Sequence, residues 1–446
     1  EDSGEFKLDQ VTCLVGKNES GKTSLLKALN SIGPWDTEDG QLDRERDYPR
    51  RHLLDYESRH DGEEAKVVKA QWRLDDGDRQ VLREVFGATA EHISEFKTTK
   101  SYGTGGDTWE ITIDERAVLN HILSTASLHA EEVAELGDVA SIKDLKASLA
   151  TPKSERHATL KTHLDRHFAR GSAVLGVIDL LHPRMPKFLY FSQYQRMSGQ
   201  VSLEQILQKK QSNQLDDDDQ VFVALCNLVG VPVEKIAELT QFEQMNSRLE
   251  AASSRITREI FEYWSQNKHL KVQFRVDAGK RGDPAPFNTG NVVRTRIFNE
   301  HHEVTVSFDE RSSGFVWFFS FLVLFSQVQK THSSNLIILL DEPALSLHAK
   351  AQADLLRYIE ERLAPTHQVI YTTHSPFMVP AQNLTAVRTV EDVVIETATG
   401  DVVVEGTKVG DDVLSTDRDT LFPLQSALGY EITQTLFPTR HSRSQR

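Results

Sequence analysis

A glycine-rich stretch near the start of the chain has the residue types and spacing of a phosphate-binding loop. Gly16, Gly21, Lys22 and Thr23 fill the pattern G-x-x-x-x-G-K-[ST]. In that pattern backbone N–H groups surround the phosphates, the lysine neutralises β- and γ-phosphate oxygens, and the threonine hydroxyl reaches Mg²⁺. The sequence therefore predicts a nucleoside triphosphate site, whose loop also includes Asn18, Glu19, Ser20 and Ser24.

The flanking residues supply the elements that such a loop needs. The apolar run 11–15 predicts a buried strand, and Leu25, Leu26 and Leu29 recur at helical spacing after the loop. The positive end of that helix would face the bound anion. A chance match in a glycine-containing turn is the simpler explanation of the pattern, and the strand and helix argue against it.

Two acidic residues, Asp341 and Glu342, end the longest aliphatic run in the second half of the chain. An unbroken apolar run indicates a strand of a parallel sheet covered on both faces, and ligands bind at the carboxyl ends of such strands. Asp341 is predicted to hold Mg²⁺ through water, and Glu342 to polarise the attacking water in phosphoryl transfer. An exposed strand end is the alternative, and the upstream phosphate loop makes it the weaker one.

Two further positions are candidates with open alternatives. His374 follows a predicted strand at 368–372 and is placed either to touch a γ-phosphate or to serve as a capping or core histidine. Ser312 and Gly314 begin an apolar helix at 315–328, which offers a second anion-binding end. One nucleotide cannot use both ends within one subunit, so this end predicts a head-to-tail dimer; an ordinary N-capping serine is the alternative.

Composition excludes several classes of protein. The 446 residues predict two to four domains, or one domain with large insertions. The net charge of −15 opposes indiscriminate binding to nucleic acid. No signal peptide is expected from the first residues of the sequence, and the longest apolar run, 315–325, is about half the length of a membrane span. Cys13 lies in a predicted strand, so neither it nor Cys226 is expected to be bridged, which indicates a cytoplasmic protein without a membrane partner.

Two long stretches, 117–180 and 202–265, are predicted to be helical insertions. In the first, Thr151 is the expected N-cap, Pro152 the first helical position and Gly171 the end of a strongly basic helix. A solvated helix face is the simpler interpretation, and a DNA-backbone or partner-docking face is the sharper one. In the second, an acidic run at 216–219 is expected to begin a helix, and the spacing over 242–263 predicts an amphipathic helix in a bundle or coiled coil. The remaining predicted elements are strands at 67–74, 108–113, 188–191, 270–276 and 294–308, a helix at 75–97, a hairpin at 393–405 and a helix near 419–430.

Taken together, the chain resembles ATPases of the ABC/SMC class, and more closely the ATPase half of the overcoming-lysogenisation-defect (OLD) family. The resemblance rests on GKNESGKTSLLKALN, DYPRR, FLYFSQY, SFDERSSGFVWFFSF, LIILLDEPALSLHA and YTTHSPFMV. It implies an α/β fold: a P-loop NTPase of ABC/SMC type with a mostly parallel sheet and large helical insertions. The signature segment departs from the Leu-Ser-Gly-Gly form, because Arg311 and Ser313 replace its leucine and first glycine.

The resemblance also implies roles for individual residues. Lys22 and the loop amides would grip the phosphates of ATP, and Thr23 and Asp341 would hold Mg²⁺. Glu342 would be the catalytic carboxylate. The other implied roles are a γ-phosphate sensor at His374, action in trans by Ser312 and Gly314, a loop at 346–348 that communicates across the dimer, and Gln193 as the link between Mg²⁺ and the helical region.

The resemblance divides the chain as follows: 1–116 and 267–391 form the two parts of the ATPase domain, 117–184 and 202–266 are insertions, 185–201 is an ATPase strand with the glutamine, and 392–446 is a hairpin with a helical tail. OLD proteins carry a Toprim nuclease after the ATPase. Glu405-Gly406 and Asp417-x-Asp419 imitate Toprim motifs, but only ten residues lie between Gly406 and Asp417, too few for the fold, so nuclease activity on this chain is not expected.

The leading hypothesis is an ATP-hydrolysing homodimer, or higher homo-oligomer, coupled to DNA or to a Toprim nuclease in anti-phage defence or DNA maintenance. The alternative is an ATP-dependent scaffold or sensor that assembles with a separate effector protein and has little DNA-stimulated activity. A small-molecule kinase would have no use for Ser312, Gly314, His374 or the long helical insertions.

Overall fold

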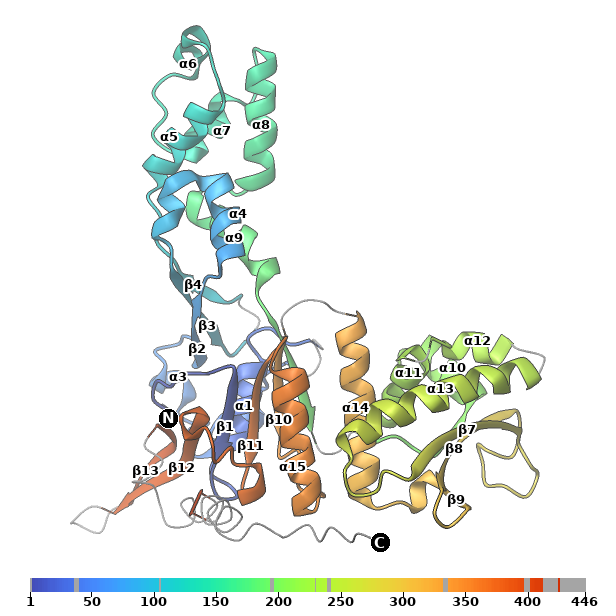
Figure 1. The fold of residues 1–446 in the computed structure, drawn as a ribbon. Coiled ribbons are helices and arrows are strands. Elements are labelled where there is room, and N and C mark those ends of the chain that lie inside the picture. Colours follow the sequence, from blue (N-terminus) through green and yellow to red (C-terminus); the bar gives the residue numbers. More distant parts are fainter. Residues whose placement is uncertain are drawn as a thin grey trace, which may run out of the picture. The chain divides into compact units, whose positions relative to one another are not determined.

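The computed structural model describes residues 2–35, 40–103, 106–192, 196–228, 230–238, 242–331, 336–396, 402–411 and 424–425 (Figure 1). These residues form two compact units. One, the core unit, consists of 1–27 and 188–446, and the other, the insertion unit, of 28–187.

The core unit is built on a six-stranded sheet in the order β13-β12-β1-β11-β10-β5. β1 pairs in parallel with β11 and β12, β10 pairs in parallel with β11, and β13 is antiparallel to β12. The predicted α/β class with a mostly parallel sheet is therefore confirmed. The strands are β1 (Val11–Val15), β5 (Lys187–Ser192), β10 (Leu336–Asp341), β11 (Gln368–Thr373), β12 (Val387–Glu396) and β13 (Val402–Gly410).

The strand order brings three carboxyl ends to one edge of the sheet. Val15, the last residue of β1, pairs with Thr373, the last residue of β11, and Leu340 of β10 pairs with Tyr371. Because parallel strands end at the same edge, the loops after β1, β10 and β11 lie next to one another. These are the loops that carry Lys22, Glu342 and His374.

Three helices accompany this sheet: α1 (Lys22–Asn30), α14 (Ser313–Thr331) and α15 (Ala349–Tyr358) (Figure 1). The aromatic run of α14 lies in the core, where Trp317 and Phe321 stack with their centroids 5.3 Å apart and Phe191 of β5 packs edge-on against both. Among the described residues no helix is both long enough and apolar enough to cross a membrane.

A second part of the core unit is an antiparallel sheet with helices around it. Its strands are β6 (Gln200–Ser202), β7 (Leu270–Ala278), β8 (Asn291–Asn299) and β9 (Val304–Ser307), and its helices α10 (Leu203–Gln211), α11 (Asp217–Leu228), α12 (Val233–Glu238) and α13 (Phe242–Tyr263). The hydroxyls of Ser253 and Thr257 on α13 accept N–H groups of β7, from Phe274 and Val272. The amphipathic helix predicted at 242–263 thus lies along a strand edge and satisfies its free donors.

The acidic run at 216–219 behaves as predicted, because Asp217–Asp219 form the first turn of α11. Lys209 pairs with Asp216 at 2.7 Å and with Asp219 at 2.6 Å, so a nearby cation and the helix N-terminus both balance the acidic charge.

The insertion unit combines a three-stranded antiparallel sheet with a helical part. A shared core includes Phe86, Ile122, Leu164 and Phe168, each at most 2% exposed. The elements are β2 (Lys66–Arg73), β3 (Glu95–Ser101), β4 (Thr108–Glu110), α2 (Arg44–Asp47), α3 (Tyr56–Arg59), α4 (Asp76–Phe86), α5 (Glu115–Thr125), α6 (Ala130–Leu136), α7 (Ile142–Ser148), α8 (Glu155–His167) and α9 (Ala173–Leu181).

Three predicted elements have other boundaries in the structure. α8 begins after Ser154, whose hydroxyl accepts the His157 N–H, so Ser154 and not Thr151 is the N-cap; the helix ends at His167, before Gly171. The helix predicted over 75–97 ends at Phe86, because Gly87 has φ +76° and a strand begins at Glu95. The strand predicted over 294–308 is two strands, β8 and β9, joined by a turn.

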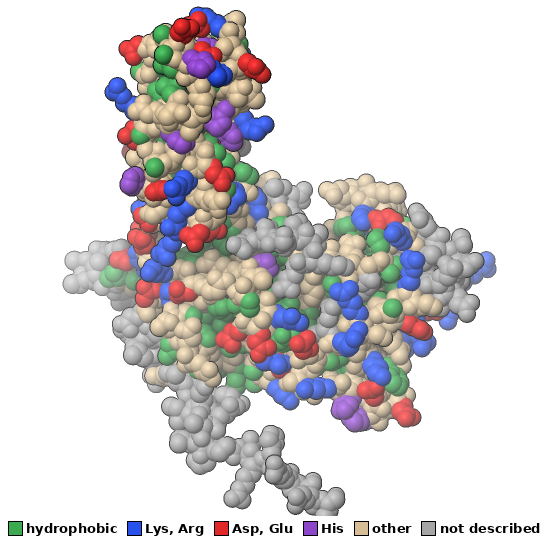
Figure 2. Space-filling model, turned by 45° about the horizontal axis from the view of Figure 1, so that its top comes forward, with side chains coloured by type: hydrophobic (Ala, Val, Ile, Leu, Met, Phe, Trp, Pro, Cys, Tyr) green, Lys and Arg blue, Asp and Glu red, His purple; other side chains and the backbone are tan. Residues whose placement is uncertain are grey.

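The basic residues of α8 and its flanks are largely paired. Arg156 lies 3.4 Å from Glu132, Lys153 lies 3.9 Å from Glu135, and Arg170 lies 2.6 Å from Asp179. Figure 2 shows acidic and basic side chains interspersed on the face of this unit that it draws. These pairs favour the solvated helix face over a DNA-backbone surface.

Candidate functional site

The loop between β1 and α1 is shaped by two glycines. Gly21 has φ +95°, a left-handed conformation that glycine adopts without steric cost. A Cβ atom on Gly16 would collide with the carbonyl oxygen of Val390 on β12. A side chain would be strained at Gly21 and would collide at Gly16, so the loop requires glycine at both positions, as the motif predicts.

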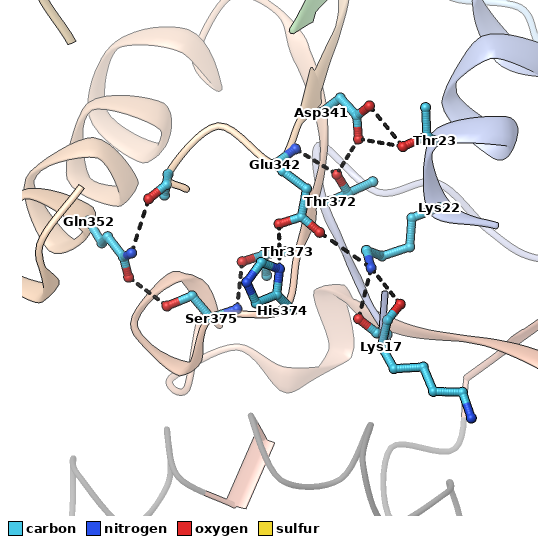
Figure 3. Close-up of polar contacts among 12 residues, drawn as sticks. Lys17, Lys22, Thr23, Asp341, Glu342, Gln352, Thr372, Thr373, His374 and Ser375 are labelled. Atoms are coloured by element: carbon cyan, nitrogen blue, oxygen red, sulfur yellow. Dashed lines mark hydrogen bonds and ion pairs between the residues drawn. The ribbon is translucent and has the colours of Figure 1, made fainter. Parts of the chain in front are cut away.

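Lys22 reaches back across this loop. Its Nζ donates to the carbonyl oxygens of Gly16 and Lys17, both at 2.8 Å, and the residue is only 6% exposed. The ammonium group also lies 3.3 Å from Glu342 Oε1 (Figure 3). The cation that a phosphate-binding loop needs is thus fixed at the mouth of the loop.

Glu342 lies between two candidate phosphate-contacting groups. Besides the contact with Lys22, its Oε2 is 2.9 Å from His374 Nδ1. Its backbone has φ +46°, rare for a residue with a side chain, and its N–H donates to the Thr372 hydroxyl at 2.8 Å. Non-glycine residues held in this region cluster at functional sites, so the backbone itself marks Glu342 as a functional candidate.

Asp341 accepts hydrogen bonds from three hydroxyl groups. Thr23 Oγ1 lies 2.9 Å from Oδ2, Thr372 donates at 2.9 Å, and the Tyr190 hydroxyl donates at 2.9 Å. A threonine hydroxyl beside a carboxylate is a set of hard oxygen donors, which suits Mg²⁺ better than a softer metal. Two of the three residues predicted at the metal, Thr23 and Asp341, therefore lie together and have suitable chemistry.

The structure brings five predicted site residues into one cluster: Lys22, Thr23, Asp341, Glu342 and His374 (Figure 3). Gln193 lies outside the described residues. The remaining predicted residues, Gly16, Asn18, Glu19, Ser20, Gly21 and Ser24, lie in the same loop and the start of α1.

Ser312 and Gly314 have local contacts at the start of α14. The Ser312 hydroxyl accepts the Phe315 N–H at 3.4 Å, the arrangement of an N-cap, and the residue is exposed. Gly314 packs against the carbonyl oxygen of Ser346, where a Cβ would be too close. Within one subunit, Ser312 therefore acts as an ordinary N-cap of α14. The action of Ser312 and Gly314 on the nucleotide of a second subunit stays a prediction.

Two residues missed by the sequence analysis support the cluster. Tyr190 reaches Asp341 because β5 is the neighbour of β10, and only its place at the end of a predicted strand could have pointed to it. Gln352, buried on α15, accepts the Ser375 hydroxyl at 2.6 Å and donates to the carbonyl oxygens of Ala344 and Leu347 at 3.1 and 2.9 Å (Figure 3). Gln352 thereby ties the loop after Glu342 to the loop after His374.

We expect Gln352→Leu to slow ATP hydrolysis about tenfold while changing the Kd for ATP less than about threefold, since each lost buried hydrogen bond costs about 1 kcal/mol. Steady-state turnover and nucleotide titration check this. The matched control is Gln208→Leu on α10, whose residue is exposed and which should leave both quantities unchanged. Equal loss of binding and turnover in Gln352→Leu would contradict a positioning role.

A family model described as an AAA ATPase domain matches residues 63–379, more than half of the chain. The chain belongs to this AAA ATPase family. The prediction of a phosphate-loop ATPase domain is confirmed at this level. The matched range includes Asp341, Glu342 and His374 of the ATPase and begins after its Lys22.

Among curated proteins, the ATPase is 32% identical over 80 residues to the uncharacterized protein MJECL43 of Methanocaldococcus jannaschii. That stretch is 17% of this chain and 21% of the relative, so the chain spans about a fifth of the length of the curated relative it matches.

Solved structures similar to this ATPase include three SMC head domains. An Smc head bound to the C-terminal winged-helix domain of ScpA is 12% identical, with 89% of this chain and 90% of that chain covered and a TM-score of 0.38. An Smc head with an extended coiled coil bound to the C-terminal domain of ScpA, from Pyrococcus furiosus, is 13% identical (90% and 91% covered, TM-score 0.35). The SMC head of Thermotoga maritima is 12% identical (90% and 92% covered, TM-score 0.33).

Proposed function

We propose that this ATPase hydrolyses ATP with Glu342 as the group that orients water, and that bound ATP joins two copies of the chain. The observation that carries the first part is the position of the Glu342 carboxylate, 3.3 Å from Lys22 Nζ and 2.9 Å from His374 Nδ1. A carboxylate next to the phosphate-binding lysine is within reach of water beside a γ-phosphate.

In this proposal Lys22 exchanges its contact with Glu342 for phosphate oxygens when ATP binds. The Glu342 carboxylate is then free to accept a proton from the attacking water, and His374 keeps that carboxylate oriented. Thr23 and Asp341 would hold Mg²⁺, which when bound neutralises charge on the β- and γ-phosphates. Thr372 and Tyr190 keep Asp341 in place through their hydroxyls.

The dimer would use the first turn of α14 from the second copy. Ser312 is exposed, and Leu345, in the loop that packs against Gly314, is 53% exposed. An exposed helix N-terminus offers N–H donors to an anion, and an exposed leucine beside it offers apolar contact area. These features support a second copy that closes over the triphosphate.

Sedimentation velocity tests the dimer. The protein should sediment as a monomer without nucleotide and as a dimer with a non-hydrolysable ATP analogue. Ser312→Glu should prevent that dimer by like-charge repulsion with the triphosphate, whereas Ser124→Glu at an exposed position of α5 should not. Equal masses of the unmodified protein with and without the analogue would rule out the ATP-joined dimer.

We further propose that the ATP cycle acts on DNA or on a Toprim nuclease, in anti-phage defence or DNA maintenance, as the resemblance to OLD proteins implies. The paired, mixed charge of the insertion unit argues against a broad basic DNA-binding surface on that unit. Turnover measured with and without double-stranded DNA is the test. Stimulation of at least about threefold supports coupling to DNA, and none at low salt contradicts it.

A further inference from the structure

The hairpin formed by β12 and β13 lies against the phosphate-binding loop. β12 pairs in parallel with β1, with Thr389 opposite Val15, and so extends beside the loop that follows β1. β13 pairs antiparallel with β12 and places Thr407 opposite Asp392. The side chain of Thr407 packs where a Cβ of Gly21 would be, and its hydroxyl donates to the carbonyl oxygen of Ser20 at 3.2 Å.

A local irregularity of β13 sets the direction of Thr407. The register of the hairpin shifts between Val393, opposite Gly406, and Val394, opposite Val404, so that Glu405 is the extra residue. Gly406 has φ +83°. A β-bulge with a glycine in this conformation re-aims the side chains that follow it, and here the next side chain is Thr407. The Glu405-Gly406 pair that imitates a Toprim motif is this bulge.

The rest of the hairpin end is held firmly. Lys408 Nζ donates to the carbonyl oxygen of Asp2 at 2.8 Å, and the N–H of Val409 donates to Ser3 at 2.9 Å. Arg388 on β12 is ion-paired with Asp9 at 2.9 Å and with Asp411, just after β13, at 2.7 Å. The pairing of Gly406 with Val393 before Thr407 and these contacts after it therefore give the Thr407 hydroxyl a defined position.

The bond to Ser20 has a consequence for the phosphate loop. In a planar trans peptide the C=O of one residue and the N–H of the next point in opposite directions. Holding the Ser20 carbonyl toward β13 therefore directs the Gly21 N–H away from the hairpin. Glycine leaves this peptide plane free to turn, and the Ser20 hydroxyl is buried with no hydrogen-bond partner among the described residues, so it is not an anchor.

We propose that Thr407 is a positioning residue of the nucleotide site, which fixes the Ser20–Gly21 peptide so that the Gly21 N–H faces the phosphates. This inference rests on the proposed ATP binding at the loop after β1. It makes the affinity for triphosphate depend on the bulge in β13, far from Gly21 in the sequence.

The test compares Thr407→Val, which keeps the shape and removes the hydroxyl, with Thr407→Ser, which keeps the hydroxyl. Titration of the full chain with a fluorescent ATP analogue and Mg²⁺ should give a Kd about fivefold higher for Thr407→Val and within about twofold of the unmodified protein for Thr407→Ser. The matched control is Thr389→Val. The Thr389 hydroxyl donates to the Gly410 carbonyl oxygen and not to the phosphate loop, so this variant should keep the original Kd.

Thermal melting of each variant without nucleotide distinguishes an effect on the nucleotide site from an effect on folding. If Thr407 positions the loop, the Kd for the ATP analogue changes while the melting temperature does not. If Thr407→Val does not fold, Thr407→Ala replaces it in the comparison with Thr407→Ser. An unchanged Kd in Thr407→Val would overturn the inference. So would an equal rise in Kd in Thr407→Val and Thr407→Ser. Failure of the unmodified protein to bind the analogue would instead overturn the proposed function.

Discussion

Glu342→Gln is expected to lower steady-state ATP hydrolysis by at least about 10³-fold, and to leave ATP binding equal or tighter. Glutamine has nearly the same shape as glutamate but no negative charge, so it cannot take a proton from water. General base catalysis raises reaction rates by about 10²–10⁴-fold. Binding is preserved because the substitution also removes the ion pair between Glu342 and Lys22, which leaves the ammonium group available for phosphate oxygens.

Turnover under saturating ATP, together with a nucleotide titration, distinguishes this outcome from a general loss of folding. Glu361→Gln, at an exposed position after α15, is the matched control and should keep full activity. Retention of more than about a tenth of the original turnover in Glu342→Gln would assign the water-orienting role to another residue. In sedimentation, the same variant should remain a dimer in ATP itself, because the nucleotide that joins the two copies persists.

The parts of this site that could be predicted from sequence are those that local spacing determines. The strand, loop and helix around Lys22 are contiguous, and the apolar run before Asp341 ends where its strand ends. Since parallel strands present their carboxyl ends at one edge, the meeting of Lys22 with Glu342 followed from the fold class alone.

The parts that could not be predicted depend on which strands are neighbours. Tyr190 contacts Asp341 because β5 lies next to β10, and Thr407 contacts the phosphate loop because the predicted hairpin of β12 and β13 pairs with β1 through β12. Neither order is encoded in a repeat or a motif. Gln352 was missed for a related reason: a buried glutamine on a helix looks like any core-facing polar residue until its three partners are known.

The errors in helix boundaries have a local cause. Thr151 followed by proline and Ser154 followed by glutamate are both good helix starts, and the Ser154 hydroxyl, which caps the His157 N–H, is the one used. Cys13 shows the reverse case, in which sequence sufficed. Burial raises the pKa of its thiol to about 12, and the residue is buried and unbridged inside β1, as its place in a predicted strand indicated.

Lys22→Ala is expected to raise the Kd for ATP by more than about 100-fold and to make hydrolysis undetectable, because hydrogen bonds to charged groups are worth about 1.5–3 kcal/mol each. The loss has two sources. The ammonium group supplies positive charge to the phosphates. It also stabilises the loop by donating hydrogen bonds to the carbonyl oxygens of Gly16 and Lys17. The neighbouring carboxylate of Glu342 would in addition lose its cation and repel the triphosphate.

Lys22→Arg should not restore binding, since a planar guanidinium cannot point three donors at two loop carbonyls and a phosphate from this buried position. Isothermal titration with ATP and Mg²⁺ measures both variants, and Lys27→Ala, an exposed lysine on the same helix, is the control that should bind normally. A Kd for Lys22→Ala within about tenfold of the unmodified protein would mean that the triphosphate binds elsewhere. In that case the contacts of Lys22 with the loop and with Glu342 would serve the stability of the core unit instead.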